Sequence, residues 1–239
     1  HDEKVAILRT LVAACGDAPV LPGIAALSTR QAVALAKAAE QAGCRGLMVL
    51  PAYVHKGELR EAIGHVGAVL QATKLPCMLY NNPPAYGTDF TPPAIAELAQ
   101  RHANLVAVKE SSGDARRVTA IKALVGDRLD VLVGMDDMVV EGVAAGAVGW
   151  VAGLVNAFPR ASVRLFELAS AGQRDQAAAL YRWFLPLLRL DTVPEFVQLI
   201  KLVQNQVGQG DERVRAPRTV AHGPLREQAL AVIRTALQN

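Results

Sequence analysis

The chain has 239 residues, of which 51% are hydrophobic and 20% charged, which is enough apolar material for a sizeable core and excludes a disordered chain. Its net charge of +3 comes from scattered basic residues, which argues against nucleic-acid and anionic-membrane partners. No apolar run is long enough to span a membrane, so we expect a soluble, cytoplasmic protein with a small-molecule partner.

The chain opens on a helical pattern over residues 1–12, with Val5, Leu8 and Leu11 on one apolar face. A native domain rarely begins inside a helix, so we expect a segment upstream of His1 to be missing. Short apolar runs then alternate with helical segments. The apolar runs predict strands covered on both faces at residues 19–23, 46–50, 76–80, 105–108, 131–133 and 149–152. The segments between them predict helices at residues 29–42, 58–72, 91–100, 115–124 and 138–145.

This alternation is typical of a parallel sheet built from βα units. The chain after residue 159 is helical throughout, with helices predicted at residues 161–170, 175–190, 195–206 and 225–237. Two α/β architectures fit this order: an open doubly wound sheet, and a (β/α)8 barrel whose first two strands lie upstream of this chain. Neither a GxGxxG nor a GxxxxGK[ST] sequence occurs, so nucleotide-binding versions of the open sheet lose their usual support, and the barrel is the leading interpretation.

Candidate catalytic groups follow two neighbouring strands. Lys109 ends the apolar run LVAVK, where an ammonium pointing into a barrel mouth is desolvated, which lowers its pKa toward that of a nucleophilic amine. Tyr80 ends the preceding strand and is a candidate proton shuttle beside a Schiff-base nitrogen. Taken alone, each has a structural interpretation, a strand-end lysine in solvent and a buried aromatic residue. The pair favours Schiff-base chemistry.

These motifs carry a family resemblance over almost the whole chain. The sequence YNNP at residues 80–83, followed by KESSGD at 109–114, GMDD at 134–137 and GAVG at 146–149, resembles the dihydrodipicolinate synthase and N-acetylneuraminate lyase superfamily of class I lyases. The resemblance implies a (β/α)8 barrel with C-terminal helices, a homodimer or homotetramer, and no metal or organic cofactor. It also implies that Lys109 is the Schiff-base lysine and Tyr80 the catalytic tyrosine.

By the same resemblance, residues 1–158 form the barrel from its second helix through its eighth strand. Residues 159–239 form the last barrel helix and the C-terminal helices, packed with the barrel as one domain. The family's carboxylate-binding loop after the second strand, a Gly-Thr-Thr-Gly-Glu sequence or similar, is not found in this chain. We therefore expect the natural protein to be longer by roughly 50 to 60 residues, two βα units.

Departures from the family pattern indicate the branch. Synthases that accept aspartate semialdehyde have an arginine soon after the YNNP-like motif and a second tyrosine that reaches across the dimer, but this chain has Ala85 and Val54 there. The sequences at residues 75–89, 193–201 and 213–218 resemble Δ1-pyrroline-4-hydroxy-2-carboxylate deaminases of hydroxyproline degradation. Enzymes that dehydrate 2-keto-3-deoxy sugar acids resemble the chain strongly too, and an aldolase of such acids or a dihydrodipicolinate synthase-like enzyme is a further alternative. A non-catalytic barrel that binds a keto acid is the alternative from another class.

The substrate's carboxylate, ring and hydroxyl need polar contacts beyond the reacting pair. We predict substrate contacts from Asn81, Ser111, Gly149 and Val151, which lie at strand ends that face the same mouth. Two simpler interpretations stay open, a turn at Asn82-Pro83 and a helix cap at Ser111-Ser112.

Other polar features have structural interpretations. The acidic pair at residues 136–137 lacks accompanying ligands for a metal, so we expect it to cap the next helix. The cysteines at positions 15, 44 and 77 match neither a disulfide framework nor a zinc site. They are expected to be buried small hydrophobic residues in a reducing compartment.

Overall fold

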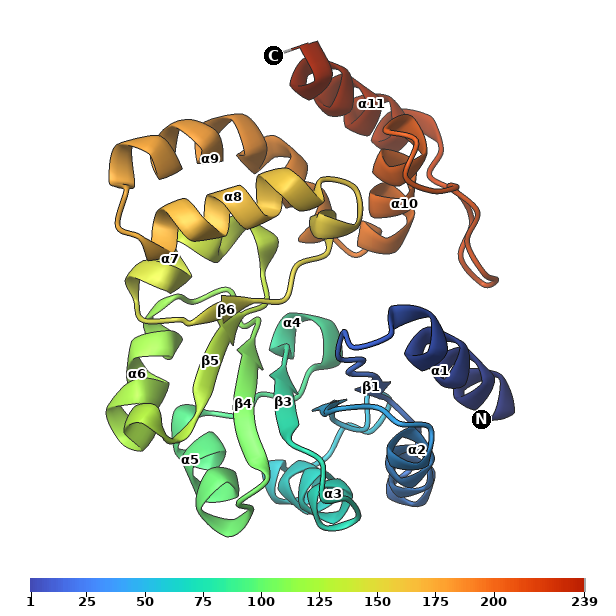
Figure 1. Cartoon of the computed structure of the whole chain (residues 1–239), viewed down its shortest axis with the longest axis vertical. Helices are drawn as coiled ribbons and strands as arrows, with labels where there is room; N and C mark the ends of the chain where they lie inside the picture. Colours follow the sequence, from blue (N-terminus) through green and yellow to red (C-terminus); the bar gives the residue numbers. More distant parts are fainter. Residues whose placement is uncertain (239) are drawn as a thin grey trace. The chain divides into compact units, whose positions relative to one another are not determined.

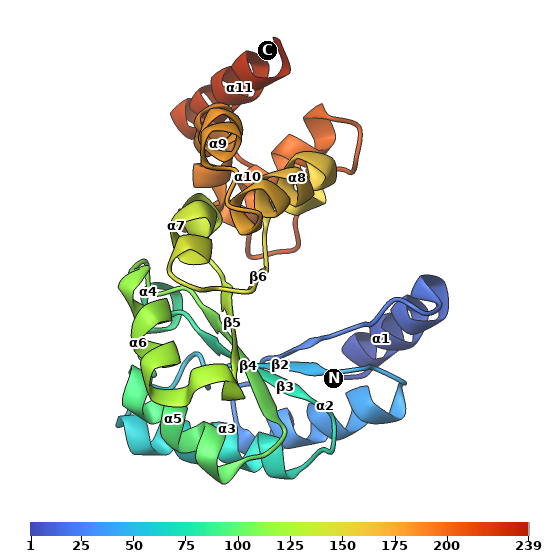
Figure 2. The ribbon, with the colours of Figure 1, turned by 60° about the vertical axis from the view of Figure 1, so that its left-hand side comes forward.

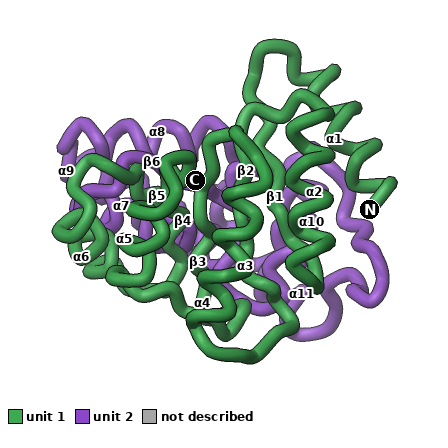
Figure 3. The backbone as a smooth tube through the Cα atoms, turned by 90° about the horizontal axis from the view of Figure 1, so that it is seen from below, with its two compact units in different colours: residues 1–132 green, residues 133–239 purple. Residues whose placement is uncertain are grey.

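A computed structural model describes residues 1–238 (Figure 1). The chain divides into two compact units, His1–Leu132 and Val133–Asn239 (Figure 3). The boundary falls inside one strand. The expected ranges 1–158 and 159–239 stay a prediction.

The first unit alternates strands with helices. Its strands are β1 (Gly23–Ile24), β2 (Leu47–Val49), β3 (Cys77–Asn81), β4 (Leu105–Glu110) and most of β5 (Asp130–Val133). Its helices are α1 (Asp2–Cys15), α2 (Thr29–Gln41), α3 (Leu59–Gln71), α4 (Pro83–Tyr86), α5 (Pro92–Arg101), α6 (Arg116–Val125) and the 3-10 turn η1 (Gly126–Arg128). In Figure 2, α2, α3 and α5 line one side of strands β2 to β4.

Strand order confirms the α/β class and separates the two architectures. The sheet has six strands in the order β1-β2-β3-β4-β5-β6, where β6 is Gly149–Trp150, and the first three pairings are parallel. A doubly wound sheet reverses its strand order at a switch point, whereas a βα barrel adds each strand beside the previous one. The observed order is therefore that of barrel strands.

Side chains of β3 and β4 alternate between two environments. Leu79 and Val108 are paired in register and fully buried. Tyr80 and Lys109 form the next pair and are only partly buried. Since successive strand residues point to opposite faces, the apolar pair lies on one face and the candidate catalytic pair on the other.

Two expectations in this unit need correction. The first strand is Gly23–Ile24 rather than residues 19–23, because Pro19 and Pro22 have no N–H to donate to a ladder. Cys44 and Cys77 are buried as expected, but Cys15 at the end of α1 is exposed. Burial raises the pKa of the Cys77 thiol to about 12, so this thiol is not reactive.

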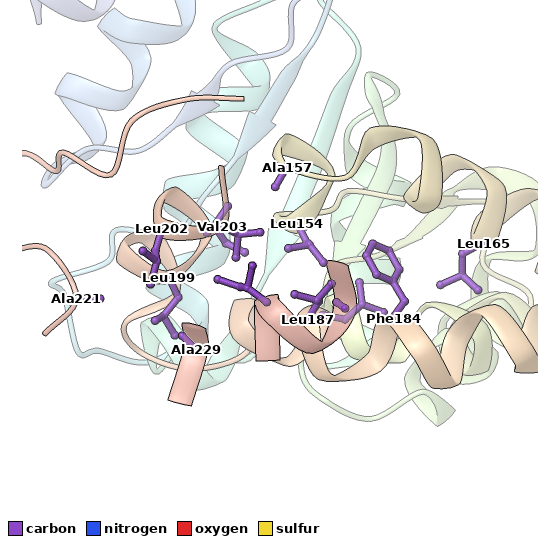
Figure 4. Packing of buried hydrophobic residues seen from close by; sticks show 14 of the residues in the cluster. Leu154, Ala157, Leu165, Phe184, Leu187, Leu199, Leu202, Val203, Ala221 and Ala229 are labelled. Carbon is purple, nitrogen blue, oxygen red and sulfur yellow. The ribbon is translucent and has the colours of Figure 1, made fainter. Parts of the chain in front are cut away.

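The second unit is mainly helical. Besides β6 it contains α7 (Val139–Ala144), α8 (Pro159–Ser170), α9 (Arg174–Leu188), α10 (Phe196–Gln206), α11 (Gly223–Gln238) and the 3-10 turns η2 (Asp136–Met138), η3 (Leu154–Asn156) and η4 (Arg189–Asp191). Its core is apolar and includes Leu154, Leu187 and Leu199 (Figure 4). Phe184 is fully buried there, 5.9 Å from Phe158 between ring centroids.

Candidate active site

The carboxyl ends of β3 and β4 bring the two predicted catalytic residues together. Tyr80 and Lys109 are register partners on these parallel strands, and the Lys109 Nζ atom lies 4.2 Å from the centroid of the Tyr80 ring. A cation over an aromatic face at this distance is attracted by the ring quadrupole. The amine is therefore held against the phenol ring.

The short helix α4 orients the Tyr80 hydroxyl. Asn82, its N-cap residue, accepts a hydrogen bond from the Ala85 N–H through Oδ1 (3.1 Å) and donates from Nδ2 to the Tyr80 oxygen (2.8 Å). The helix begins at Pro83, whose fixed φ suits a first turn, and ends at Gly87, whose φ of 71° suits a residue without Cβ. Because Asn82 donates a hydrogen bond to the phenol oxygen, the Tyr80 O–H group can donate its own proton to another acceptor.

A second tyrosine packs against this phenol. The rings of Tyr80 and Tyr86 meet edge to face, 5.7 Å apart between centroids. Burial, with a smaller contribution from Tyr80, raises the pKa of Tyr86 to about 12. Tyr86 therefore stays neutral at physiological pH and acts as packing rather than as a base.

The opposite face of the same strand ends holds a buried polar network. Asn81 is fully buried and donates from Nδ2 to Glu110 Oε2 (2.9 Å), and its Oδ1 accepts from the Phe90 N–H (2.9 Å). Glu110 is 5% exposed and its Oε1 accepts from the Ser112 N–H (2.6 Å). Burial raises the pKa of Glu110, and its hydrogen bonds from Asn81 and Ser112 oppose that shift.

An ion pair flanks this network. Arg117 of α6 donates two hydrogen bonds to the Asp89 carboxylate, at 2.6 and 2.5 Å. Asn81 Nδ2 also reaches Asp89 Oδ1 at 3.5 Å. These contacts tie the segment after β3 to the helix that follows β4.

Ser111 follows β4 and is fully buried. Its backbone N–H donates to the Asn81 carbonyl (2.8 Å), while its Oγ has no hydrogen-bond partner among residues 1–238. The alternative cap role is wrong for Ser111 and Ser112, because the N-cap residue of α6 is Ala115, which makes no side-chain cap hydrogen bond. Ser112 Oγ accepts from the Asp114 N–H (3.4 Å) instead. The Ser111 hydroxyl is thus available to a polar ligand atom.

The remaining two predicted contact residues belong to the second unit. Gly149 lies in β6, and Val151 follows it and donates its N–H to the Val133 carbonyl (2.9 Å). The structure places Tyr80, Lys109, Asn81 and Ser111 at neighbouring strand ends of the first unit. Gly149 and Val151 lie in and directly after β6, the last strand in the order of the sheet.

The expectation that the acidic pair at 136–137 caps the next helix is wrong, because no side chain caps α7. Asp136 is fully buried and accepts hydrogen bonds from Trp150 Nε1 (3.1 Å) and from the N–H groups of Gly153 (3.0 Å) and Leu154 (2.7 Å). It therefore fixes the segment after β6. Separation in the sequence hid this role, because its partners lie 14 to 18 residues away.

The sequence also left the roles of Asn82 and Glu110 unrecognised. An asparagine directly before two prolines is a helix-start signal that could have identified the N-cap. No comparable signal marks Glu110, since a carboxylate at a strand end is usually exposed. Among residues 1–238, the histidine, cysteine and acidic side chains form no cluster of three that could hold a metal, and no helix is long and apolar enough to cross a membrane.

Comparison with known proteins places this geometry in a family. The sequence profile of the Dihydrodipicolinate synthetase family matches residues 1–237. The 4-hydroxy-tetrahydrodipicolinate synthase of Geotalea daltonii is 32% identical over 203 residues, covering 83% of this chain and 68% of the relative. The protein of that name from Geobacter metallireducens is 28% identical over 235 residues, covering 98% and 81%.

Solved structures agree. The 4-hydroxy-tetrahydrodipicolinate synthase from Methylacidiphilum fumariolicum SolV superposes with a TM-score of 0.94 at 25% identity, over 100% of this chain and 80% of that one. A prophage protein of the dihydrodipicolinic acid synthase family from E. coli K12, in complex with pyruvate, gives a TM-score of 0.90 at 25% identity over 99% and 81%. The chain belongs to the dihydrodipicolinate synthetase family, whose members are Schiff-base lyases on a TIM-barrel fold.

Proposed function

We propose that Lys109 forms a Schiff base with a small 2-oxo or cyclic imino acid and that Tyr80 moves protons at the bound substrate. The observation that carries the proposal is the amine of Lys109 held 4.2 Å above the Tyr80 ring on adjacent strand ends. Covalent catalysis needs a nucleophile and a proton carrier within reach of the same substrate atoms. The Asn82 contact leaves the Tyr80 proton to be donated toward that substrate.

The best candidate substrate is Δ1-pyrroline-4-hydroxy-2-carboxylate. Lys109 adds to C2 of the ring imine, and transimination releases the ring nitrogen as an amine on C5. The enzyme-bound iminium acidifies the C3 proton, a base removes it, and the C4 hydroxyl leaves as water after protonation by Tyr80. Tautomerisation gives an imine at C5. Water hydrolyses this imine to ammonia and an aldehyde, and a second water frees Lys109 and a 2,5-dioxo acid.

Two positions support a deaminase over a synthase. Ala85 lies in the first turn of α4, close to Tyr80 in the sequence, and carries no charge for a second carboxylate. Val54 is 63% exposed and has no hydroxyl to relay a proton. A cyclic imine that carries its own carboxylate and hydroxyl needs neither group. Ser111, Gly149 and Val151 are the proposed contacts to those polar substituents.

Other members of the reaction class compete with this assignment. A 2-keto-3-deoxy sugar acid undergoes the same loss of a β-hydroxyl from a lysine-bound iminium, with no nitrogen to expel. The relatives are named 4-hydroxy-tetrahydrodipicolinate synthases, and this similarity supports a second competing activity, the condensation of pyruvate with aspartate semialdehyde. The departures at Ala85 and Val54 argue against that synthase activity.

Trapping tests the nucleophile. Incubation with pyruvate and borohydride should add the reduced ligand irreversibly to the peptide that carries Lys109, as read by peptide mass spectrometry. The variant Lys122→Arg, changed on α6, is the matched control and should give the same adduct. The absence of an adduct, or an adduct at another lysine, would overturn the Schiff-base proposal.

Side-by-side kinetics test the substrate. We expect ammonia release from Δ1-pyrroline-4-hydroxy-2-carboxylate and no condensation of pyruvate with aspartate semialdehyde. A kcat/KM at least tenfold higher for a 2-keto-3-deoxy sugar acid, about 1.4 kcal/mol in the transition state, would replace the deaminase with a dehydratase.

We further propose a cytoplasmic homodimer or homotetramer that works without metal or organic cofactor. Light scattering gives the oligomeric state. Turnover after exhaustive dialysis against a chelator tests for a metal, and its loss would contradict the proposal.

A further inference from the structure

A buried polar pair lies directly behind the proposed catalytic pair. In the ladder of β3 and β4, Tyr80 pairs with Lys109 and the next rung pairs Asn81 with Glu110. Because strand residues alternate, this rung points to the opposite face of the sheet. The Asn81–Glu110 hydrogen bond of 2.9 Å therefore joins the two strands immediately behind the two reacting groups.

The pairing of β3 with β4 is irregular, so its register needs a specific contact to fix it. Cys77 pairs with Leu105 but Met78 pairs with Ala107, so β4 carries one extra residue, Val106, ahead of the site. A slip of one residue would turn Lys109 to the opposite face and bring Glu110 opposite Tyr80. A specific contact beyond the irregularity is what holds the register at the reacting pair.

Both members of the pair are also fixed from outside the ladder. Asn81 accepts from the Phe90 N–H and Glu110 accepts from the Ser112 N–H, so the side chains cannot rotate without losing these bonds. A buried carboxylate costs free energy that a well-packed apolar pair would not. Its cost is offset here by directional bonds that set strand position rather than by a gain in packing.

We propose that Asn81 and Glu110 are positioning residues that hold Tyr80 and Lys109 opposite each other, an inference that rests on the proposed function of those two. Neither acts on the substrate. Asn81 thereby takes a different role from the substrate contact expected from the sequence, since its amide is already bonded to Glu110 and Phe90.

A swap of hydrogen-bond direction tests the pair. Glu110→Gln removes one of two acceptors and sets two amide N–H groups against each other. The double change Asn81→Asp with Glu110→Gln reverses the bond, because the amide at 110 then donates to the carboxylate at 81. The amide oxygen at 110 still accepts from Ser112 N–H, and the carboxylate at 81 still accepts from Phe90 N–H. The double variant loses the 3.5 Å contact from Asn81 Nδ2 to Asp89 Oδ1 and brings a carboxylate close to Asp89, but Arg117 remains ion-paired with Asp89 and offsets this repulsion.

Two rates are measured: the formation of the borohydride-trapped pyruvate adduct at Lys109, and kcat on the preferred substrate. We expect Glu110→Gln to lower both by about 10- to 100-fold with KM changed less than about twofold, the scale of a small misplacement of reacting groups. The double variant should recover both to within about fivefold of the wild type. Glu40→Gln, which alters the carboxylate bonded to Thr73 (2.8 Å) before β3, is the matched control and should change neither rate.

The following outcomes test whether Asn81 and Glu110 position the reacting pair. Unchanged rates in Glu110→Gln overturn the proposal. So does a double variant that is folded by near-ultraviolet circular dichroism but stays more than tenfold below the wild type, since the charge rather than the pair would then matter. If Glu110→Gln alone does not fold, the double variant still decides by the same threshold. A wild type that forms no adduct contradicts the proposed function itself, which is a distinguishable failure.

Discussion

The two units differ in the polar side chains that they bury beside their apolar cores. The buried polar and charged residues of the first unit are His65, Thr73, Asn81, Glu110 and Ser111, whereas the second unit, within residues 133–238, buries Asp136 and Ser162. Three of the five in the first unit lie at the ends of β3 and β4. The core of the second unit consists of leucine and aromatic packing. Directional bonds fix positions to fractions of an ångström, while apolar burial contributes stability without direction.

This contrast predicts that changes at the polar strand ends of the first unit affect chemistry and that changes in the apolar core of the second unit affect stability. The largest expected effect is at Lys109. Lys109→Arg keeps the charge but removes the amine that forms the Schiff base, so turnover and adduct formation should fall below detection. Assays of both on protein with an unchanged melting temperature provide the test. Residual turnover above background would show that another group is the nucleophile.

Removing an aromatic ring from the second unit should cost stability. Phe184 is fully buried and stacks 5.2 Å from Trp183. Phe184→Ala leaves a cavity and should lower the free energy of unfolding by about 3–5 kcal/mol. Denaturant unfolding measures the loss, with Val163→Ala on the exposed side of α8 as the control. A comparable loss in the control would contradict this account of the core.

Removing the Tyr80 hydroxyl should lower kcat less than replacing Lys109 does. Tyr80→Phe keeps the ring against Lys109 and removes the hydroxyl held by Asn82, so kcat should fall by about 10²-fold, the usual scale for a positioned proton-transfer group. Steady-state kinetics measure the change, and denaturant unfolding should show little loss. An unchanged kcat would mean that another group moves the proton.

The smallest expected effect is a pH-dependent change in folding stability at His65. Its Nδ1 lies 3.0 Å from Thr29 Oγ1, and burial lowers its pKa below 6.5. A lowered pKa means that the folded state disfavours the protonated ring, so its stabilising contribution is present above pH 6.5 and is lost as the pH falls through the lowered value. Denaturant unfolding from pH 7.5 to 5 should therefore show a decline that His65→Gln reduces. His222→Gln, at an exposed histidine, should leave the decline unchanged.

Much of the architecture was readable from the sequence because it depends on short-range patterns. Continuous apolar runs identified strands such as β3 and β4, since a strand covered on both faces needs apolar side chains throughout. Helical periodicity identified α2, α3 and α10 within one or two residues. Lys109 and Tyr80 were identifiable as candidates because parallel strands bring their carboxyl ends to one edge.

Prediction from the sequence failed for side chains whose role depends on partners far away in the chain. The roles of Asp136 and Glu110 were missed because a carboxylate gives the same local signal whether it caps a helix, lies in solvent or accepts buried hydrogen bonds. Residue spacing cannot reveal the extra residue at Val106, which sets the register that places Lys109 opposite Tyr80. The sequence alone thus determined the βα order and the reacting residue types, because these follow from local hydrophobicity and intrinsic chemistry. Only the tertiary structure decided which face each side chain occupies and which polar atoms meet, because register and burial arise from contacts between strands far apart in the chain.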